Sequence, residues 1–195
     1  MDNKVKTKIN TLDDKKKTFA ESAIVVGAIL LICYFLGFSY IWNTDVGAEV
    51  GVNGWNYIIA CFSWSFKKTG AAYGDIAVPF YYYAKEYVPV MAVATTVSFG
   101  ILLLFIVVSC FNIKKYNRKL AITIMVILYV LAAAYLACIV IALTMNASRI
   151  LPKYCNSNPK CSIATLVFFP FFITLAYAIV TSVYIRKFRL EEEAE

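Results

Sequence analysis

The sequence contains no histidine, and it lacks the short motifs by which enzymes commonly hold nucleotides, metals or reactive nucleophiles. There is no phosphate-binding glycine loop, no GxSxG and no CxxC. Histidine is the usual general base and the commonest protein ligand for metals, so its absence removes the ordinary routes to acid–base and zinc chemistry. We therefore predict a protein that is not an enzyme and that uses no cofactor, no metal and no small-molecule substrate.

Charged side chains are also missing from the interiors of four long apolar runs, at 19–42, 89–113, 119–145 and 163–185. Catalysts and ion-coupled transporters that work inside the bilayer normally keep ionisable groups at membrane depth. The polar groups within these runs are thiols and hydroxyls. The hydroxyls belong to Ser39, Thr95, Thr96, Ser98, Ser109, Thr123, Thr174 and Thr181.

The runs themselves are the main feature of a chain that is 61% hydrophobic, well above the roughly 45–50% of soluble domains. Each run has the roughly 20 apolar residues that cross about 30 Å of hydrocarbon. We predict an all-α integral membrane protein, a bundle of four transmembrane helices. Its segments are an arm or short helix at 1–18, spans at 19–42, 89–113, 119–145 and 163–185, connections at 43–88, 114–118 and 146–162, and a tail at 186–195.

The distribution of lysine and arginine predicts the orientation. Thirteen of the nineteen lie in 1–18, in 114–119 or in 186–195, and six lie in the other two connections. Cations near span ends are retained in the cytoplasm. We therefore predict cytoplasmic termini in a multi-pass protein of the plasma (cytoplasmic) membrane, with 43–88 and 146–162 outside. The net charge of +7 then reflects this topology and attraction to anionic lipid head groups, and we expect no nucleic-acid partner.

The connection 43–88 carries more aromatic side chains than a solvated linker would. Within it, Trp55, Ile59, Phe62 and Phe66 recur at helical spacing and would form one stripe, although alternate residues of 56–66 also fit a strand. A cluster of tyrosines follows at Tyr81, Tyr82 and Tyr83. Tyrosine and tryptophan are enriched at protein interfaces, so we predict that these seven residues contact a partner, unless lipid or the same chain covers them.

Small residues recur every four positions in the third run, at Ala134, Cys138 and Ala142. This spacing lets helices approach closely in lipid, either within the bundle or at a dimer face. In the fourth run, Pro170 predicts a kink.

Cys155 and Cys161 flank the turn-forming sequence NSNPK in the connection that we place outside. A disulfide between them is the favoured interpretation, because a metal site would need further ligands.

Two functional hypotheses follow. The first is a non-enzymatic accessory or assembly protein that binds a larger membrane complex, or a copy of itself, through its aromatic connection. The alternative is a homo-oligomeric pore or channel lined by the hydroxyl-bearing faces of the second and fourth spans.

Overall fold

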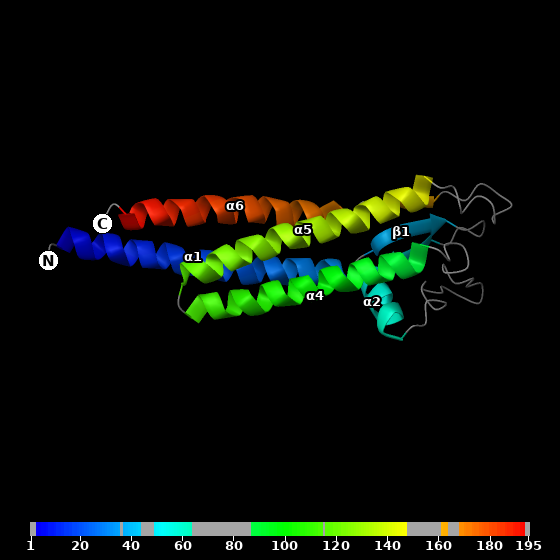
Figure 1. Ribbon diagram of the computed structural model, residues 1–195, viewed down its shortest axis with the longest axis horizontal. Helices are drawn as coiled ribbons and strands as arrows, with labels where there is room; N and C mark the ends of the chain where they lie inside the picture. Colours follow the sequence, from blue (N-terminus) through cyan, green and yellow to red (C-terminus); the bar gives the residue numbers. More distant parts are fainter. Residues whose placement is uncertain are drawn as a thin grey trace.

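The computed structural model describes residues 3–35, 37–43, 49–63, 87–114, 116–147, 161–163 and 168–193. Four long helices lie side by side: α1 (Asn3–Cys33), α4 (Tyr87–Lys114), α5 (Arg118–Ala147) and α6 (Phe168–Glu193) (Figure 1). Both α1 and α5 contact α4 and α6, so the four form a closed ring. The two termini lie at one end of the bundle, here called the terminal end; α2 and β1 lie toward the other, the sheet end (Figure 1).

Three helices are long and apolar enough to cross a membrane: Pro89–Ile113 within α4, Arg118–Thr144 within α5 and Phe168–Glu191 within α6. The prediction of a membrane protein with transmembrane helices is confirmed for these three. The short connection between α4 and α5 makes them an antiparallel pair, as expected. The apolar part of α1, residues 18–33, covers only about 24 Å at 1.5 Å per residue, less than the roughly 30 Å of hydrocarbon.

The predicted helix over 19–42 does not extend to its expected end. α1 is continuous from Asn3, so it includes most of the basic arm, and it stops at Cys33. Gly37–Asn43 forms strand β1 instead. The sequence of β1, GFSYIWN, starts with a glycine and is rich in aromatic residues, which suit a strand better than a helix.

A small antiparallel sheet joins β1 to β2 (Glu49–Asn53) and β3 (Cys161–Ile163) in the order β2-β1-β3. Trp42 pairs with Val50 on one side and with Cys161 on the other. The predicted all-α fold includes no sheet, so this sheet is a correction to the prediction. β3 comes from a segment more than a hundred residues later in the chain, so no local sequence pattern predicts its pairing with β1. The fold is therefore the predicted bundle of helices with a small sheet added to it.

Pro170 does not interrupt a span. It is the third residue of α6, which begins at Phe168 and not at 163 as predicted. The first N–H groups of a helix have no partner within it, so proline costs little in the first turn. The predicted kink within the fourth span is therefore wrong.

The bundle core is apolar and includes a close contact between helices. Leu102 and Phe105 of α4 and Leu128 and Leu131 of α5 are fully buried. A Cβ atom added to Gly27 of α1 would lie 2.8 Å from Cγ1 of Ile106, closer than side chains pack. Glycine therefore lets α1 lie directly against α4 at this level.

Aromatic side chains join α1 to α6 at the terminal end. The ring of Phe19 lies 5.4 Å from that of Tyr184 and 6.0 Å from that of Phe188. Lys15 and Glu191 approach to 4.0 Å beyond this cluster, and the ammonium of Lys16 lies 5.6 Å from the ring centre of Tyr116. The first and last helices are thus held together where the basic residues gather.

Candidate functional site

Helix α2 (Gly54–Ser63) contains three of the four residues of the predicted stripe. The helical interpretation of this segment is confirmed, and the strand alternative is wrong. Asn53 precedes the helix, and its Oδ1 accepts a hydrogen bond of 2.8 Å from the N–H of Asn56. This is the contact by which an N-cap asparagine satisfies a free N–H of the first turn, so the sequence itself fixes where α2 begins.

The two faces of α2 differ in exposure. Tyr57 and Ile58 are buried against the bundle, where α2 packs along α4. The opposite face presents Trp55, Ile59 and Phe62, which are 37%, 51% and 75% exposed. These are the stripe residues, so the residues predicted to share one face of a helix do share it, and this face is the exposed one.

Tyr34, directly after α1, anchors α2 to the bundle. Its carbonyl oxygen accepts a hydrogen bond of 3.0 Å from the N–H of Trp55. A Cβ atom added to Gly54 would lie 2.7 Å from Cδ1 of Tyr34, so only glycine fits at this contact. The hydroxyl of Tyr34 lies 2.8 Å from Oγ of Ser98 in α4, and both side chains are fully buried.

An exposed aromatic patch, defined by Phe35, Trp55, Ile59 and Phe62, results from this anchoring. Phe35 is 57% exposed and stacks on Trp55, with ring centres 5.5 Å apart and planes 28° apart. Trp55 also meets the edge of Phe99 of α4 at 6.1 Å. The patch is built on a helix that packs against α4 and is hydrogen-bonded to Tyr34, directly after α1, so the backbone of the patch is fixed to the bundle.

The patch lies near the depth expected for one membrane surface. Ser98, which contacts Tyr34, is about 24 Å along α4 from Lys114 at 1.5 Å per residue. A hydrocarbon layer that begins at the basic connection after α4 would end about 30 Å away, just beyond this level. Tryptophan commonly lies at such a boundary, because its ring is apolar and its N–H is polar.

Several predicted site residues lie outside the described part of the chain. They are Phe66, Tyr81, Tyr82, Tyr83 and Cys155. Cys161 is the first residue of β3, where its backbone pairs with that of Trp42.

The small residues of the third span face the bundle. Cys138 and Ala142 are buried and Ala134 is half-buried. Of the two interpretations offered for this row, packing within the chain is the one that its position favours.

The hydroxyls proposed to line a pore also lie inside the bundle. Thr95, Ser98 and Ser109 of α4 and Thr174 and Thr181 of α6 are all fully buried. A pore formed between copies would need these groups on an outer face of each copy. Their burial disfavours that alternative. Within the described ranges, no three cysteine, aspartate or glutamate side chains are grouped so that they could hold a metal ion.

Sequence reasoning missed the residues that position the patch, Tyr34, Phe35 and Gly54. Tyr34 and Phe35 lie within the predicted span 19–42, and Gly54 lies within the predicted connection 43–88. The one available signal was that Gly54 stands directly before the stripe.

No protein-family model matches the sequence, and no curated protein matches it either. The functional argument therefore depends on the geometry described above.

Proposed function

We propose that this chain is a non-enzymatic membrane protein with an accessory or assembly role, and that it binds a second membrane protein through the aromatic patch. The observation that carries the proposal is the pairing of a rigid anchor with an exposed apolar face. Tyr34 and Gly54 fix α2 against the bundle, and the opposite face of α2 leaves Phe62 75% exposed.

The chemistry of the patch favours protein over lipid as its partner. Lipid chains cover any apolar surface, and the valines and leucines on the outer faces of α4 and α5 serve that purpose. The patch instead contains two stacked aromatic rings and a third nearby on a short helix that crosses the bundle surface. Aromatic side chains bury a large area with little loss of conformational entropy, and they are enriched at protein interfaces for this reason.

The proposed setting is the plasma (cytoplasmic) membrane, with the terminal end in the cytoplasm. Both termini lie at this end, and so does the connection between α4 and α5 (Figure 1). Thirteen of the nineteen lysine and arginine residues belong to these segments. The patch would then lie at the outer surface, and the proposed disulfide between Cys155 and Cys161 would form in an oxidising compartment.

Site-specific photocrosslinking tests the proposal in the membranes where the protein is naturally made. A photoreactive phenylalanine analogue replaces Phe62 in the patch, and in a matched control it replaces Val107, a 51% exposed residue on the outer face of α4. We expect a discrete protein adduct from position 62 and only lipid adducts from position 107. Lipid adducts alone at both positions would contradict the proposal, and an adduct with the chain itself would identify the partner as a second copy.

The substitution Phe62→Ala separates binding from folding, because Phe62 is 75% exposed, whereas Trp55 also packs on Phe35 and Phe99. We expect the adduct formed from a second patch position, Ile59, to disappear while the thermal unfolding temperature in detergent stays the same. If that temperature falls and the adduct persists, the patch stabilises the fold and does not bind a partner.

A further inference from the structure

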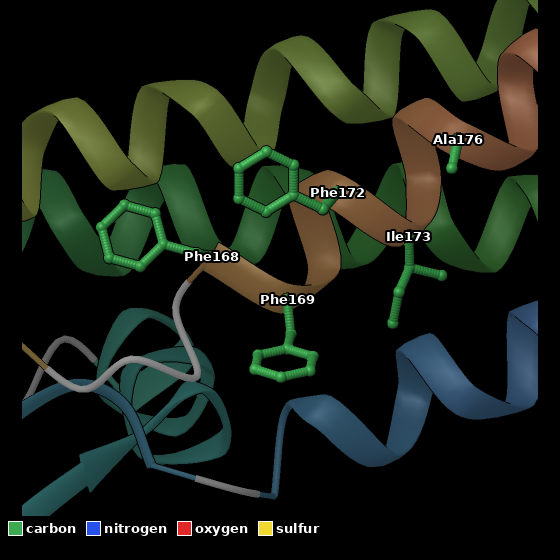
Figure 2. A pocket seen from close by; sticks show the side chains of 5 residues that line it. All are labelled: Phe168, Phe169, Phe172, Ile173 and Ala176. Carbon is green, nitrogen blue, oxygen red and sulfur yellow. The ribbon is translucent and has the colours of Figure 1, made fainter.

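The side chains of α6 change from apolar to basic along the helix. Figure 2 shows its first turns, which carry the apolar side chains of Phe168, Phe169, Phe172, Ile173 and Ala176. The first cation of α6 is Arg186, about 27 Å along the helix from Phe168 at 1.5 Å per residue. This length nearly matches the roughly 30 Å of hydrocarbon, so Arg186 lies where the head groups of the phospholipids begin.

A seam joins α5 to α6 on the outer surface of the bundle. The hydroxyl of Tyr129 in α5 lies 3.2 Å from Oγ of Ser182 in α6, and Tyr129 is 42% exposed. This contact identifies the faces of the two helices that meet at the outer surface. We call the line along which they meet the α5–α6 seam.

Arginines from both helices lie on the faces that form this seam. Residues that are four, seven or eleven positions apart share one face of a helix. Arg118 is eleven residues before Tyr129, and Arg186 and Arg189 are four and seven residues after Ser182. All three arginines are exposed.

The arginines also lie at one level of the bundle, the terminal end. The ring of Tyr116 meets the edge of the Phe188 ring, with centres 5.7 Å apart. Tyr116 is two residues before Arg118, and Phe188 lies between Arg186 and Arg189. The packing of α5 against α6 therefore brings together cations that are far apart in the sequence.

Two carboxylates at the same end of the bundle face lysines of α1. Glu191 lies 4.0 Å from Lys15, and Glu21 lies 4.0 Å from Lys17. Glu191 is nine residues after Ser182, which is about half a turn away from the seam at 3.6 residues per turn. These two acids therefore do not neutralise the arginines of the seam.

We propose that the terminal end of the α5–α6 seam binds the phosphate group of an anionic phospholipid. Guanidinium groups donate paired hydrogen bonds to phosphate oxygens, and basic sites between transmembrane helices bind anionic head groups. Phosphatidylcholine carries a cation that the arginines repel, so the site selects anionic lipids. Closer to the middle of the membrane, the exposed side chains of Ile122 and Ile179 give the acyl chains an apolar surface beside the seam.

The retention of two lipids by the full chain tests this proposal. The protein in neutral detergent is titrated with dioleoylphosphatidylglycerol or with dioleoylphosphatidylcholine, and native mass spectrometry counts the lipids that stay bound. We expect phosphatidylglycerol to be retained several-fold more than phosphatidylcholine. Equal retention of the two lipids would overturn the proposal.

A matched pair of variants separates a site from the general attraction between a basic protein and anionic lipids. Arg118→Gln with Arg186→Gln removes two charges from the seam and should lower the retention of phosphatidylglycerol to that of phosphatidylcholine. Lys119→Gln with Lys187→Gln removes two charges at the same level, each about 100° around its helix from the neighbouring arginine, and should leave the retention unchanged. Equal losses in the two variants would show attraction by net charge alone and overturn the proposal.

The four substituted side chains are exposed, so both variants should unfold at the same temperature in detergent as the unchanged chain. If the double arginine variant does not fold, Arg186→Gln compared with Lys187→Gln gives the same test with one charge removed from each. Equal retention of phosphatidylglycerol by these two single variants would likewise overturn the proposal.

Inorganic phosphate distinguishes a lipid site from a site for a soluble phosphate. A phosphatidylglycerol with a fluorescent group on one acyl chain is bound to the protein in detergent, and millimolar inorganic phosphate is added. Potassium chloride at equal ionic strength corrects for screening of the charges. We expect phosphate to release no more lipid than potassium chloride does, because the acyl chains also hold the lipid. Greater release by phosphate would identify a soluble anion as the ligand and overturn the proposal.

Discussion

The hydroxyl of Tyr34 lies 2.8 Å from Oγ of Ser98, and this contact joins the end of α1 to the middle of α4. Ser98 donates its own proton to the carbonyl oxygen of Thr95 at 2.8 Å, so Tyr34 is the donor to Ser98. Through its carbonyl oxygen Tyr34 also holds the N–H of Trp55. One buried residue, through its side chain and its backbone, thus connects the core of the bundle to the helix that carries the aromatic patch.

Removal of this hydroxyl should weaken both the bundle and the anchoring of α2. Interhelical hydrogen bonds in membranes contribute about 0.6 kcal/mol on average and up to about 1.7 kcal/mol. For Tyr34→Phe we expect a loss of about 0.5–1.5 kcal/mol in the free energy of unfolding, measured by denaturant titration in micelles. Alkylation of the half-buried Cys61 in α2 should also become faster.

Tyr184→Phe is the control for that substitution, because Tyr184 is 40% exposed and its described contacts are made by its ring. It should leave both measurements unchanged. If Tyr34→Phe lowers the stability while the alkylation rate of Cys61 stays constant, Tyr34 does not position α2, and the patch depends on other contacts.

Substitution by alanine should have opposite effects on stability at Gly27 and at Gly100. The new methyl group of Gly27→Ala would meet Cγ1 of Ile106 at 2.8 Å, and overpacking of this kind costs about 1–3 kcal/mol. A Cβ atom on Gly100 meets nothing within 4 Å, so Gly100→Ala should be neutral or stabilise by up to about 1 kcal/mol through helix propensity. Unfolding of both variants in the same detergent gives the comparison. Equal stability would show that α1 and α4 are less closely packed than described.

The sequence predicts the helices well and the sheet end poorly, because a helix depends on local hydrogen bonds and a sheet depends on distant partners. An uninterrupted apolar run needs only its own backbone to satisfy its hydrogen bonds, so the ends of α4 and α5 agree with prediction to within two residues. β1 depends on partners from 49–53 and 161–163, and the last of these is distant in the chain. The apolar residues 37–42 therefore resembled the end of a span.

The candidate site likewise has one part that the sequence predicts and one part that it does not. The stripe Trp55, Ile59 and Phe62 follows a local period, and that period correctly predicted the helix. That the stripe is the exposed face of this helix comes from the structure. The roles of the anchoring residues Tyr34 and Gly54 follow from contacts between elements. Such contacts leave no regular spacing, so a single sequence does not reveal them.

Thr181 allows a test of the buried hydroxyls. Its Oγ1 is buried in α6 and has no hydrogen-bond partner among the described residues. Valine has nearly the same shape and no polar atom, so Thr181→Val should be neutral or stabilise by up to about 1 kcal/mol in detergent unfolding. Ser98→Ala, which loses two hydrogen bonds, should be destabilising in the same assay. A destabilised Thr181→Val would show that this hydroxyl is satisfied within the bundle.

The proposed orientation is tested by adding cysteines on the two sides of the membrane. Asn117 is exposed in the connection between α4 and α5, beside Arg118 and Lys119. An Asn117→Cys variant should react with a membrane-impermeant maleimide only after cells are permeabilised, because the proposed orientation places the basic connection in the cytoplasm. Ala71→Cys, in the part of 43–88 outside the described residues, should react in intact cells. The unchanged chain corrects for the native thiols. Labelling of position 117 in intact cells would reverse the orientation and place the aromatic patch at the cytoplasmic surface, where its partner would then have to be sought.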